Sequence, residues 1–144
     1  MAKLRIATAQ FPVSTKIARN FDYIAELTAR AKKEKADIAH FSETCLGGYA
    51  GSEFNSWDNY DWDSLKAAEA DLQQLAKDLK IGMVYGTNHR ASRNDMRNSL
   101  VYVSNKGERV GRYDKRFCTG GDLKFYNAGS VLSPLILMAS SADC

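Results

Sequence analysis

The sequence has few cysteines, little net charge and no long apolar run, and each shortage argues against a class of protein. Three cysteines in 144 residues, without the spacing of metal ligands, predict neither a disulfide framework nor a zinc site. The 20 basic and 17 acidic residues are interspersed and leave a charge of +3, so nucleic acid is not an expected partner. No tract resembles a spanning helix or signal peptide, so we expect no membrane partner and a cytoplasmic location.

The remaining composition is that of an ordinary soluble protein. It is 44% hydrophobic and 26% charged, and the chain is long enough for one domain with a core of its own. No internal repeat, low-complexity tract or linker divides it. One domain is therefore expected.

Strand-like and helical patterns alternate from the start of the chain. Residues 4–11 form an apolar run that Pro12 closes, as expected of a first strand. Apolar residues then recur every three or four positions over residues 17–31, which predicts an amphipathic helix with Asn20 as the cap of its main body. A second strand is predicted at residues 37–41. Such a strand-helix-strand unit is normally parallel, which places both strand ends at one edge of an α/β sheet.

The middle of the chain is predicted to form a long loop and then a second helix. Residues 50–63 are rich in turn formers and aromatics and would lie over the mouth of a pocket. The aromatic residues could line a substrate site or anchor the loop on the domain; they are Trp57, Tyr60 and Trp62. The helix is predicted to begin at Ser64, with Asp63 or Ser64 as its cap.

Residues 81–113 are predicted to consist mainly of strands. Residues 81–87 and 99–103 are predicted strands, joined by a polar loop that contains residues 93–95. The turn at residues 104–107 offers asparagine and glycine for positive φ angles, so a hairpin to residues 108–113 is expected.

Two charged residues directly follow predicted strands. Glu43 comes after the apolar run at residues 37–41, and Lys115 follows residues 108–113. Ligand sites in α/β proteins lie beyond the carboxyl ends of the strands, so we expect both side chains to face a common pocket. The residues alone leave two plainer interpretations open: a solvated acid in a loop, and a surface lysine paired with Asp114 or Glu43.

A series of short motifs gives these two residues a context. In chain order the motifs are Ile6-Ala7-Thr8-Ala9-Gln10, Ala36-Asp37, Phe41-Ser42-Glu43, Leu46, Gly48, Tyr49, Asn98-Ser99, Gly107, Tyr113-Asp114-Lys115, Gly121-Asp122 and Gly129. Their order and spacing resemble the N-terminal half of the carbon-nitrogen hydrolase, or nitrilase, superfamily. Ser42 stands where the family usually has proline, and Asp122 stands near a position where it often has a second glutamate.

This resemblance implies an α/β fold, an α-β-β-α sandwich of the nitrilase type with only the N-terminal half present. It also implies a Glu-Lys-Cys triad that hydrolyses a small-molecule amide, nitrile or carbamoyl substrate without cofactor or metal. Glu43 would be the base, Lys115 the stabiliser of the oxyanion, and Asp122 an auxiliary acid. Because half a sandwich leaves sheet faces and edges open, we expect a homo-oligomer.

A nucleophile for this triad is not convincingly present. Cys45 follows Glu43 too closely, and Cys118 lies in a turn where the family usually has no nucleophile, so we interpret both as free buried thiols. Cys144 lacks the strand before it and the residues after it that accompany the family's nucleophile. The chain is therefore expected to be an inactive, truncated form.

The likeness to the family ends near Ser133. We therefore consider a shifted reading frame of the coding DNA. In that frame the codons of Met138-Ala139 must yield a glycine, and those of Asp143-Cys144 must yield a leucine. Permitted codons at the other positions give the strand, turn and strand that lead to the family's nucleophile. We therefore divide the chain into a partial hydrolase domain, residues 1–133, and a hypothetical out-of-frame tail, residues 134–144.

A second class of protein fits the same alternation of strands and helices. A small flavodoxin-like or half-sandwich module would bind a ligand without catalysis, with Thr119-Gly120-Gly121 as an anion-binding turn. The sheet distinguishes a flavodoxin-like module from a hydrolase. The module would have a single parallel sheet, whereas half of a nitrilase fold should contain antiparallel pairing between residues 98 and 113.

Overall fold

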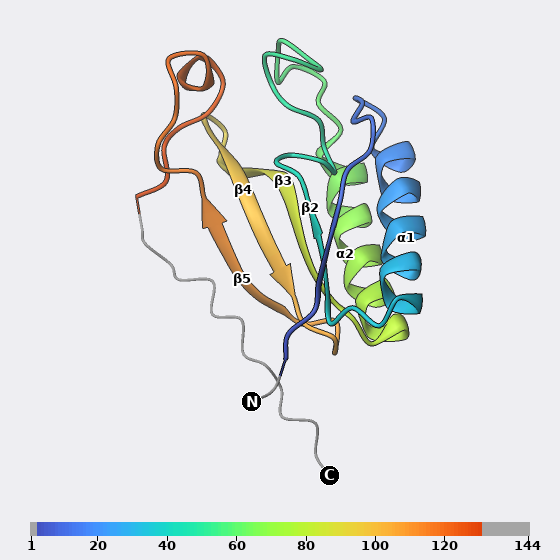
Figure 1. Ribbon diagram of the computed structural model, residues 1–144. Coiled ribbons are helices and arrows are strands. Elements are labelled where there is room, and N and C mark those ends of the chain that lie inside the picture. The colour runs from blue at the N-terminus through green and yellow to red at the C-terminus, as the bar shows by residue number, and fades with distance from the viewer. Residues whose placement is uncertain (1–2, 131–144) are drawn as a thin grey trace.

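A computed structural model describes residues 3–130 as one five-stranded sheet with two helices (Figure 1). Its elements are β1 (Ile6–Ala9), α1 (Ile17–Lys33), β2 (Ile38–Phe41), α2 (Trp62–Leu79), β3 (Gly82–Ser92), β4 (Asp95–Val103), β5 (Arg109–Asp114) and the short 3-10 helix η1 (Asp122–Lys124). The sheet order is β1-β2-β3-β4-β5. The hypothetical tail, residues 134–144, lies outside the described residues.

The sheet is mixed, with a parallel half and an antiparallel half. β1, β2 and β3 run parallel, while β4 is antiparallel to both β3 and β5. The antiparallel pairing expected between residues 98 and 113 is therefore confirmed. The flavodoxin-like alternative is wrong, because two of the four strand pairs are antiparallel.

Both helices pack on the same face of the sheet (Figure 1). Ile24 of α1 and Leu72 of α2 have no exposed surface and belong to one apolar cluster with Met83 of β3. A smaller cluster of Ile38, Val84 and Tyr102, with Leu100 packed against it, forms a second group of buried residues. Strict alternation along the strands separates the two groups, so the larger core lies between the helices and the sheet.

Asn20 does not cap α1, contrary to the prediction. The helix begins at Ile17, three residues earlier, and Asn20 is fully buried inside it. Its side-chain amide donates to the carbonyls of Ser14 (2.7 Å) and Leu46 (3.0 Å), and its oxygen accepts from the Ser14 amide (3.0 Å). A polar residue on the buried face of a helix must find such partners. Asn20 thus ties α1 to the loop that follows Glu43.

The cap of α2 is Asp61, not Asp63 or Ser64. The Asp61 carboxylate accepts from the Ser64 backbone amide at 2.9 Å, and the helix begins at Trp62. The prediction was two residues late because Trp62, which packs on the core three residues before Leu65, was assigned to the aromatic loop.

Several strand boundaries and one turn residue also differ from the predictions. β1 is shorter than residues 4–11, whereas β3 extends to Ser92 and β4 begins at Asp95, which leaves a two-residue turn between them. The polar residues at the end of β3 concealed its length. Gly107 has the positive φ expected in the next turn (+80°), but Asn105 does not.

The aromatic residues of the long loop pack on one another and on the domain. The rings of Trp57 and Trp62 are stacked at a centroid distance of 5.4 Å. The Trp57 indole donates to the carbonyl of Phe125 (2.9 Å), and the Tyr60 hydroxyl donates to that of Gly47 (2.9 Å). Of the two interpretations of these side chains, the contacts support the one in which they anchor the loop.

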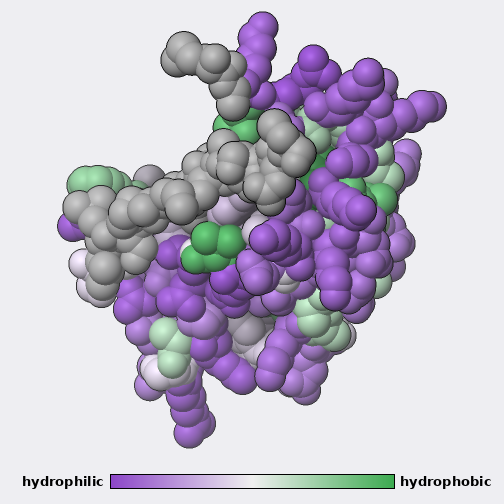
Figure 2. Space-filling model, turned by 90° about the horizontal axis from the view of Figure 1, so that it is seen from below, coloured by the Kyte–Doolittle hydropathy of each residue, from purple (hydrophilic) through white to green (hydrophobic). Residues whose placement is uncertain are grey.

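The surface seen from below is mainly hydrophilic (Figure 2). Single apolar side chains are exposed on the two outer strands of the sheet: Ile6 of β1 is 49% exposed and Val110 of β5 is 51% exposed. Neither helix within residues 3–130 has the length and apolar character needed to cross a membrane.

Candidate active site

Glu43 lies in the turn that follows β2, at the carboxyl end of that parallel strand. The chain turns immediately after it, with a positive φ (47°) at Thr44. The Glu43 side chain is 47% exposed, so its carboxylate is held near the surface and not within the core. This is the position expected from the sequence.

The turn at Glu43 packs directly against the backbone of β3. A Cβ atom at Gly86 would lie 2.2 Å from the Thr44 amide nitrogen and 2.6 Å from the Ser42 carbonyl oxygen. The carbonyl of Gly86 accepts from the amide of Leu46 (3.1 Å). The absence of a side chain at Gly86 therefore allows the two backbones to approach and fixes the turn that carries Glu43.

Lys115 follows β5 directly and brings its ammonium group to Glu43. Its backbone amide donates to the carbonyl of Asn98 (2.8 Å), which continues the pairing with β4. The Lys115 Nζ atom lies 2.9 Å from Glu43 Oε1, 3.1 Å from Asp122 Oδ2 and 3.4 Å from the Tyr49 hydroxyl. These three acceptors match the three protons of an ammonium group. Burial lowers the pKa of Lys115, but the bonds to these acceptors outweigh that effect and raise the pKa above its usual value.

Asp122 joins the same cluster from the start of η1. Its side chain is 3% exposed and accepts from the Tyr49 hydroxyl and from the Thr119 amide (2.7 Å) in addition to Lys115. Burial alone would raise the pKa of Asp122, but the hydrogen bonds from Tyr49, Thr119 and Lys115 lower it to about 2. Asp122 is therefore a fixed negative charge at neutral pH, and Glu43, Lys115 and Asp122 lie together.

Two further residues, Asn98 and Tyr49, complete the cluster, and no role was predicted for either from the sequence. The Asn98 side-chain amide donates to Glu43 Oε1 at 2.6 Å, and Tyr49 links Lys115 to Asp122. Both belong to the motifs that carry the family resemblance. Asn98 could have been noticed as a polar residue just before an apolar strand segment, but its partner lies 55 residues away and only the fold reveals it.

The two cysteines within the described residues differ in their surroundings. Cys45 has no exposed surface, and burial raises the pKa of its thiol to about 12. Cys118 is only partly buried, so its interpretation as a buried thiol is wrong; its sulfur contacts the carbonyl of Lys115 at 3.6 Å. Burial and the nearby Asp122 carboxylate also raise the pKa of Cys118. Cys144 lies outside the described residues.

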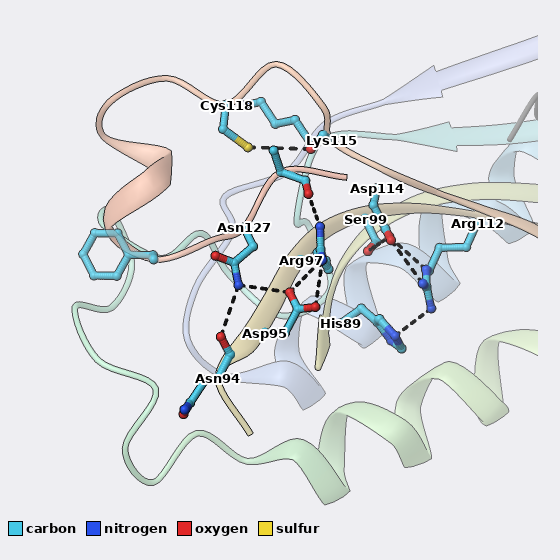
Figure 3. A network of polar contacts seen from close by, with 12 residues as sticks. His89, Asn94, Asp95, Arg97, Ser99, Arg112, Asp114, Lys115, Cys118 and Asn127 are labelled. Atoms are coloured by element: carbon cyan, nitrogen blue, oxygen red, sulfur yellow. Dashed lines mark hydrogen bonds and ion pairs between the residues drawn. The ribbon is translucent and has the colours of Figure 1, made fainter. Parts of the chain in front are cut away.

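A polar network fixes the loop after Lys115 to β4 (Figure 3). Arg97 forms an ion pair with Asp95 (2.6 Å) and donates to the carbonyl of Ala128, while Asn127 donates to Asp95 (3.0 Å). The amide of Gly129 donates to the carbonyl of Lys115 (2.9 Å) and closes the loop. The segment that carries Asp122 is thus held at both ends.

A second group of bonds in the same figure fixes β5 to β4 and β3. Asp114 accepts from Ser99 (2.7 Å) and from Arg112 (2.8 Å), and Arg112 also contacts the ring nitrogen of His89 (2.7 Å). Asp114 is therefore paired with Arg112 and not with Lys115. The plainer interpretation of Lys115 as a partner of Asp114 is not supported; its charged partners are Glu43 and Asp122.

Within residues 3–130, no group of three or more histidine, cysteine, aspartate or glutamate side chains is arranged to hold a metal ion. The acidic pair at the site, Glu43 and Asp122, is bridged by Lys115.

The fold defines the class of the protein. A mixed five-stranded sheet with two helices on one face is the N-terminal half of an α/β sandwich of the nitrilase type. The family model for carbon-nitrogen hydrolases matches residues 5–135. The chain belongs to the carbon-nitrogen hydrolase family.

Solved structures of amidases share this fold. The NitN amidase from Neterenkonia sp. AN1 has a TM-score of 0.81 and 21% identity, over 90% of this chain and 51% of its own. A double mutant of the amidase from Nesterenkonia sp. AN1 in complex with acrylamide has a TM-score of 0.80 and 21% identity, over 89% and 49%. The chain thus spans about half the length of these structures. A search of curated proteins finds no match.

Proposed function

We propose that the complete protein hydrolyses the carbon-nitrogen bond of a small non-peptide amide, and that this chain supplies the base and the cation of the reaction. The observation that carries the proposal is the position of the Lys115 ammonium between Glu43 (2.9 Å) and Asp122 (3.1 Å). A nitrile or a carbamoyl compound offers a similar electrophilic carbon. We favour an amide as the substrate because amidases of the same fold have been solved in complex with acrylamide and butyramide.

Glu43 is the proposed base. A cysteine thiol would pass its proton to Glu43, and the thiolate would attack the carbonyl carbon of the amide. The carbon-nitrogen bond then breaks as Glu43 returns the proton to the nitrogen, which leaves as ammonia or an amine. Water next adds to the thioester and gives a proton to Glu43. The carbon-sulfur bond breaks, the carboxylic acid leaves, and the thiol is restored.

Lys115 is the proposed stabiliser of the oxyanion that forms in both steps. A fixed positive charge beside the reacting carbon stabilises the developing negative charge, and loss of such a donor typically lowers the rate about 10²–10³-fold. Asp122 would act through Lys115, because its buried carboxylate keeps the ammonium charged and in place.

We further propose that the 144-residue chain alone is inactive. Cys45 is buried with a raised pKa, and the Cys118 sulfur contacts the carbonyl of Lys115, so neither thiol is set to attack a substrate. We do not assign this role to Cys144. Stoichiometric acylation of Cys144 by an activated amide, if abolished by Cys144→Ser and by Glu43→Gln, would show that the triad is complete after all.

Ammonia release tests the proposed reaction. We expect a protein expressed after a one-base frame correction near Ser133 to release ammonia from acetamide or butyramide, and Glu43→Gln or Lys115→Ala to lower kcat/KM by about 10² or more. Asp71→Asn, an exposed change on α2, serves as the control. Turnover that survives Glu43→Gln would contradict the proposal. Amide binding without turnover would favour a half-sandwich module that binds without catalysis.

A further inference from the structure

The two oxygens of the Glu43 carboxylate are not equivalent. Oε1 accepts hydrogen bonds from Asn98 (2.6 Å) and from Lys115 (2.9 Å). Within residues 3–130, no residue donates to Oε2. A carboxylate has about four lone-pair sites, two on each oxygen, so both sites on Oε1 are in use. Only Oε2 is open to a further proton.

Asn98 is itself held firmly by the sheet. It is 4% exposed, lies in β4 and pairs with Asn88 of β3, while its carbonyl accepts from the backbone amide of Lys115 (2.8 Å). Asn98 therefore contacts Glu43 through its side chain and Lys115 through its main chain. The acid and the lysine keep a fixed separation as long as β4 is intact.

We propose that Asn98 is a positioning residue of the hydrolase site, which holds Glu43 by Oε1 so that Oε2 takes the proton of the nucleophile. This inference rests on the proposed function. An amide suits the task because it donates a hydrogen bond without adding charge. A second cation at this position would weaken Glu43 as a base, and an aspartate would repel it.

The side-chain amide resonances of Asn98 test this contact in the 144-residue chain without an enzyme assay. We expect Glu43→Gln to move these resonances in the ¹H–¹⁵N NMR spectrum, because it replaces the charged acceptor of the Asn98 amide. Asp114→Asn, which removes a neighbouring carboxylate that does not contact Asn98, should leave them in place. Resonances that do not respond to Glu43→Gln would overturn the proposal.

The conformation of Glu43 tests the positioning itself. Three-bond couplings should report one side-chain rotamer for Glu43 in the unmodified chain and loss of that single rotamer in Asn98→Ala. Asn88→Ala is the matched control. Asn88 is as deeply buried and pairs with Asn98, but its side chain contacts Gly48, Tyr60 and Tyr126 instead. It should lower stability without releasing Glu43.

The outcomes separate this proposal from the proposed function. A single Glu43 rotamer that persists in Asn98→Ala, or is lost equally in Asn88→Ala, overturns the positioning role. If the frame-corrected protein releases no ammonia, the proposed function fails, although the NMR results still show whether Asn98 orients Glu43.

Discussion

The Lys115 ammonium lies 2.9 Å from the Glu43 carboxylate, although 72 residues separate the two in the chain. Glu43 follows the central parallel strand β2, and Lys115 follows the outer strand β5. Between them lie β3, which contacts the Glu43 turn through Gly86, and β4, which supplies Asn98. The relative positions of these two charges are thus set by the sheet within residues 3–130.

Substitution of Gly86 by alanine should destabilise the fold. The new methyl group would lie 2.2 Å from the Thr44 nitrogen, and forcing it into this backbone contact should lower the free energy of unfolding by about 2–3 kcal/mol. Urea denaturation measures the change. Gly120→Ala is the control, because nothing lies within 4 Å of a Cβ atom there. Equal effects at both positions would contradict the described packing of the Glu43 turn.

Asp122→Asn should reduce the stability of the protein at neutral pH and make that stability less dependent on pH. The pKa of Asp122 is lowered from 3.8 to about 2 in the fold, so the unfolded chain takes up the proton first. The ionised side chain therefore stabilises the protein above about pH 4, by about 2 kcal/mol, and this contribution is lost as the pH falls toward 2.

Urea denaturation at pH 7 and at pH 3 measures the contribution of Asp122. The unmodified chain should lose stability between these values, and Asp122→Asn should lose less. Asp71→Asn, at an exposed site on α2, should behave like the unmodified chain. A variant as acid-sensitive as the unmodified chain would show that Asp122 is not held in its charged form.

The thiols of Cys45 and Cys118 should differ in reactivity. Because burial raises the pKa of Cys45 to about 12 and leaves it no exposed surface, iodoacetamide at pH 7.5 should alkylate it on the order of 10² times more slowly than Cys118. Peptide mapping by mass spectrometry measures both rates in one sample. In urea the two rates should become similar. Rapid alkylation of Cys45 in the folded chain would be inconsistent with its burial.

Self-association, which was expected from the sequence, remains a proposal. Ile6 and Val110 are about half exposed on the two outermost strands, where unpaired strand edges favour association. Ile6→Lys together with Val110→Lys should therefore shift sedimentation velocity profiles toward the monomer. Phe117→Lys removes a more exposed apolar side chain from a loop and should not do so. A monomer at all concentrations before any substitution would refute the proposal.

Sequencing of the coding DNA tests the hypothesis that residues 134–144 are read out of frame. If residues 134–144 are an out-of-frame tail, the coding sequence near Ser133 contains a one-base change of frame. Its repair should give an uninterrupted continuation through a glycine-rich strand to a cysteine followed by an aromatic residue and an acid. Immediate stop codons in the repaired frame, or no cysteine within about 3–10 residues, the usual length of a strand, would disprove it.

Local patterns were sufficient to predict the elements of the fold but not all of their ends. Apolar periodicity and apolar runs identified both helices and four of the strands, because those residues face the core, and the turn at residues 104–107 identified β5. Some ends carry a core residue, such as Ile17 and Phe41, but others are polar and give no such signal. Asp61 was missed as a cap because Trp62, which packs on the core three residues before Leu65, was assigned to the aromatic loop, and the end of β3 was missed because its last residues are polar and largely exposed.

The site residues that could be predicted from the sequence are charged residues that stand directly after a strand. Glu43 and Lys115 each follow a strand, and the motifs placed them in one family. The contacts of Asn98 and Tyr49 were not predictable, because a neutral side chain gives no sign of its function until its partners are known. Asp122 lies between these cases: its position was noted, but its hydrogen bonds to Tyr49 and Thr119 depend on the conformation of a loop.

Because three acceptors surround the Lys115 ammonium, the proposed substrate would have to replace one of them in order to bind there. Every proton of Nζ already has a partner, so a carbonyl oxygen can reach the cation only by replacing one of them. The Tyr49 hydroxyl is the most distant (3.4 Å) and the only uncharged acceptor of the three, and it is the one that an incoming oxygen would displace at least cost. An amide oxygen accepts hydrogen bonds more strongly than a ketone oxygen, and a ketone oxygen more strongly than a phenol oxygen, so an amide would gain the most from displacing Tyr49.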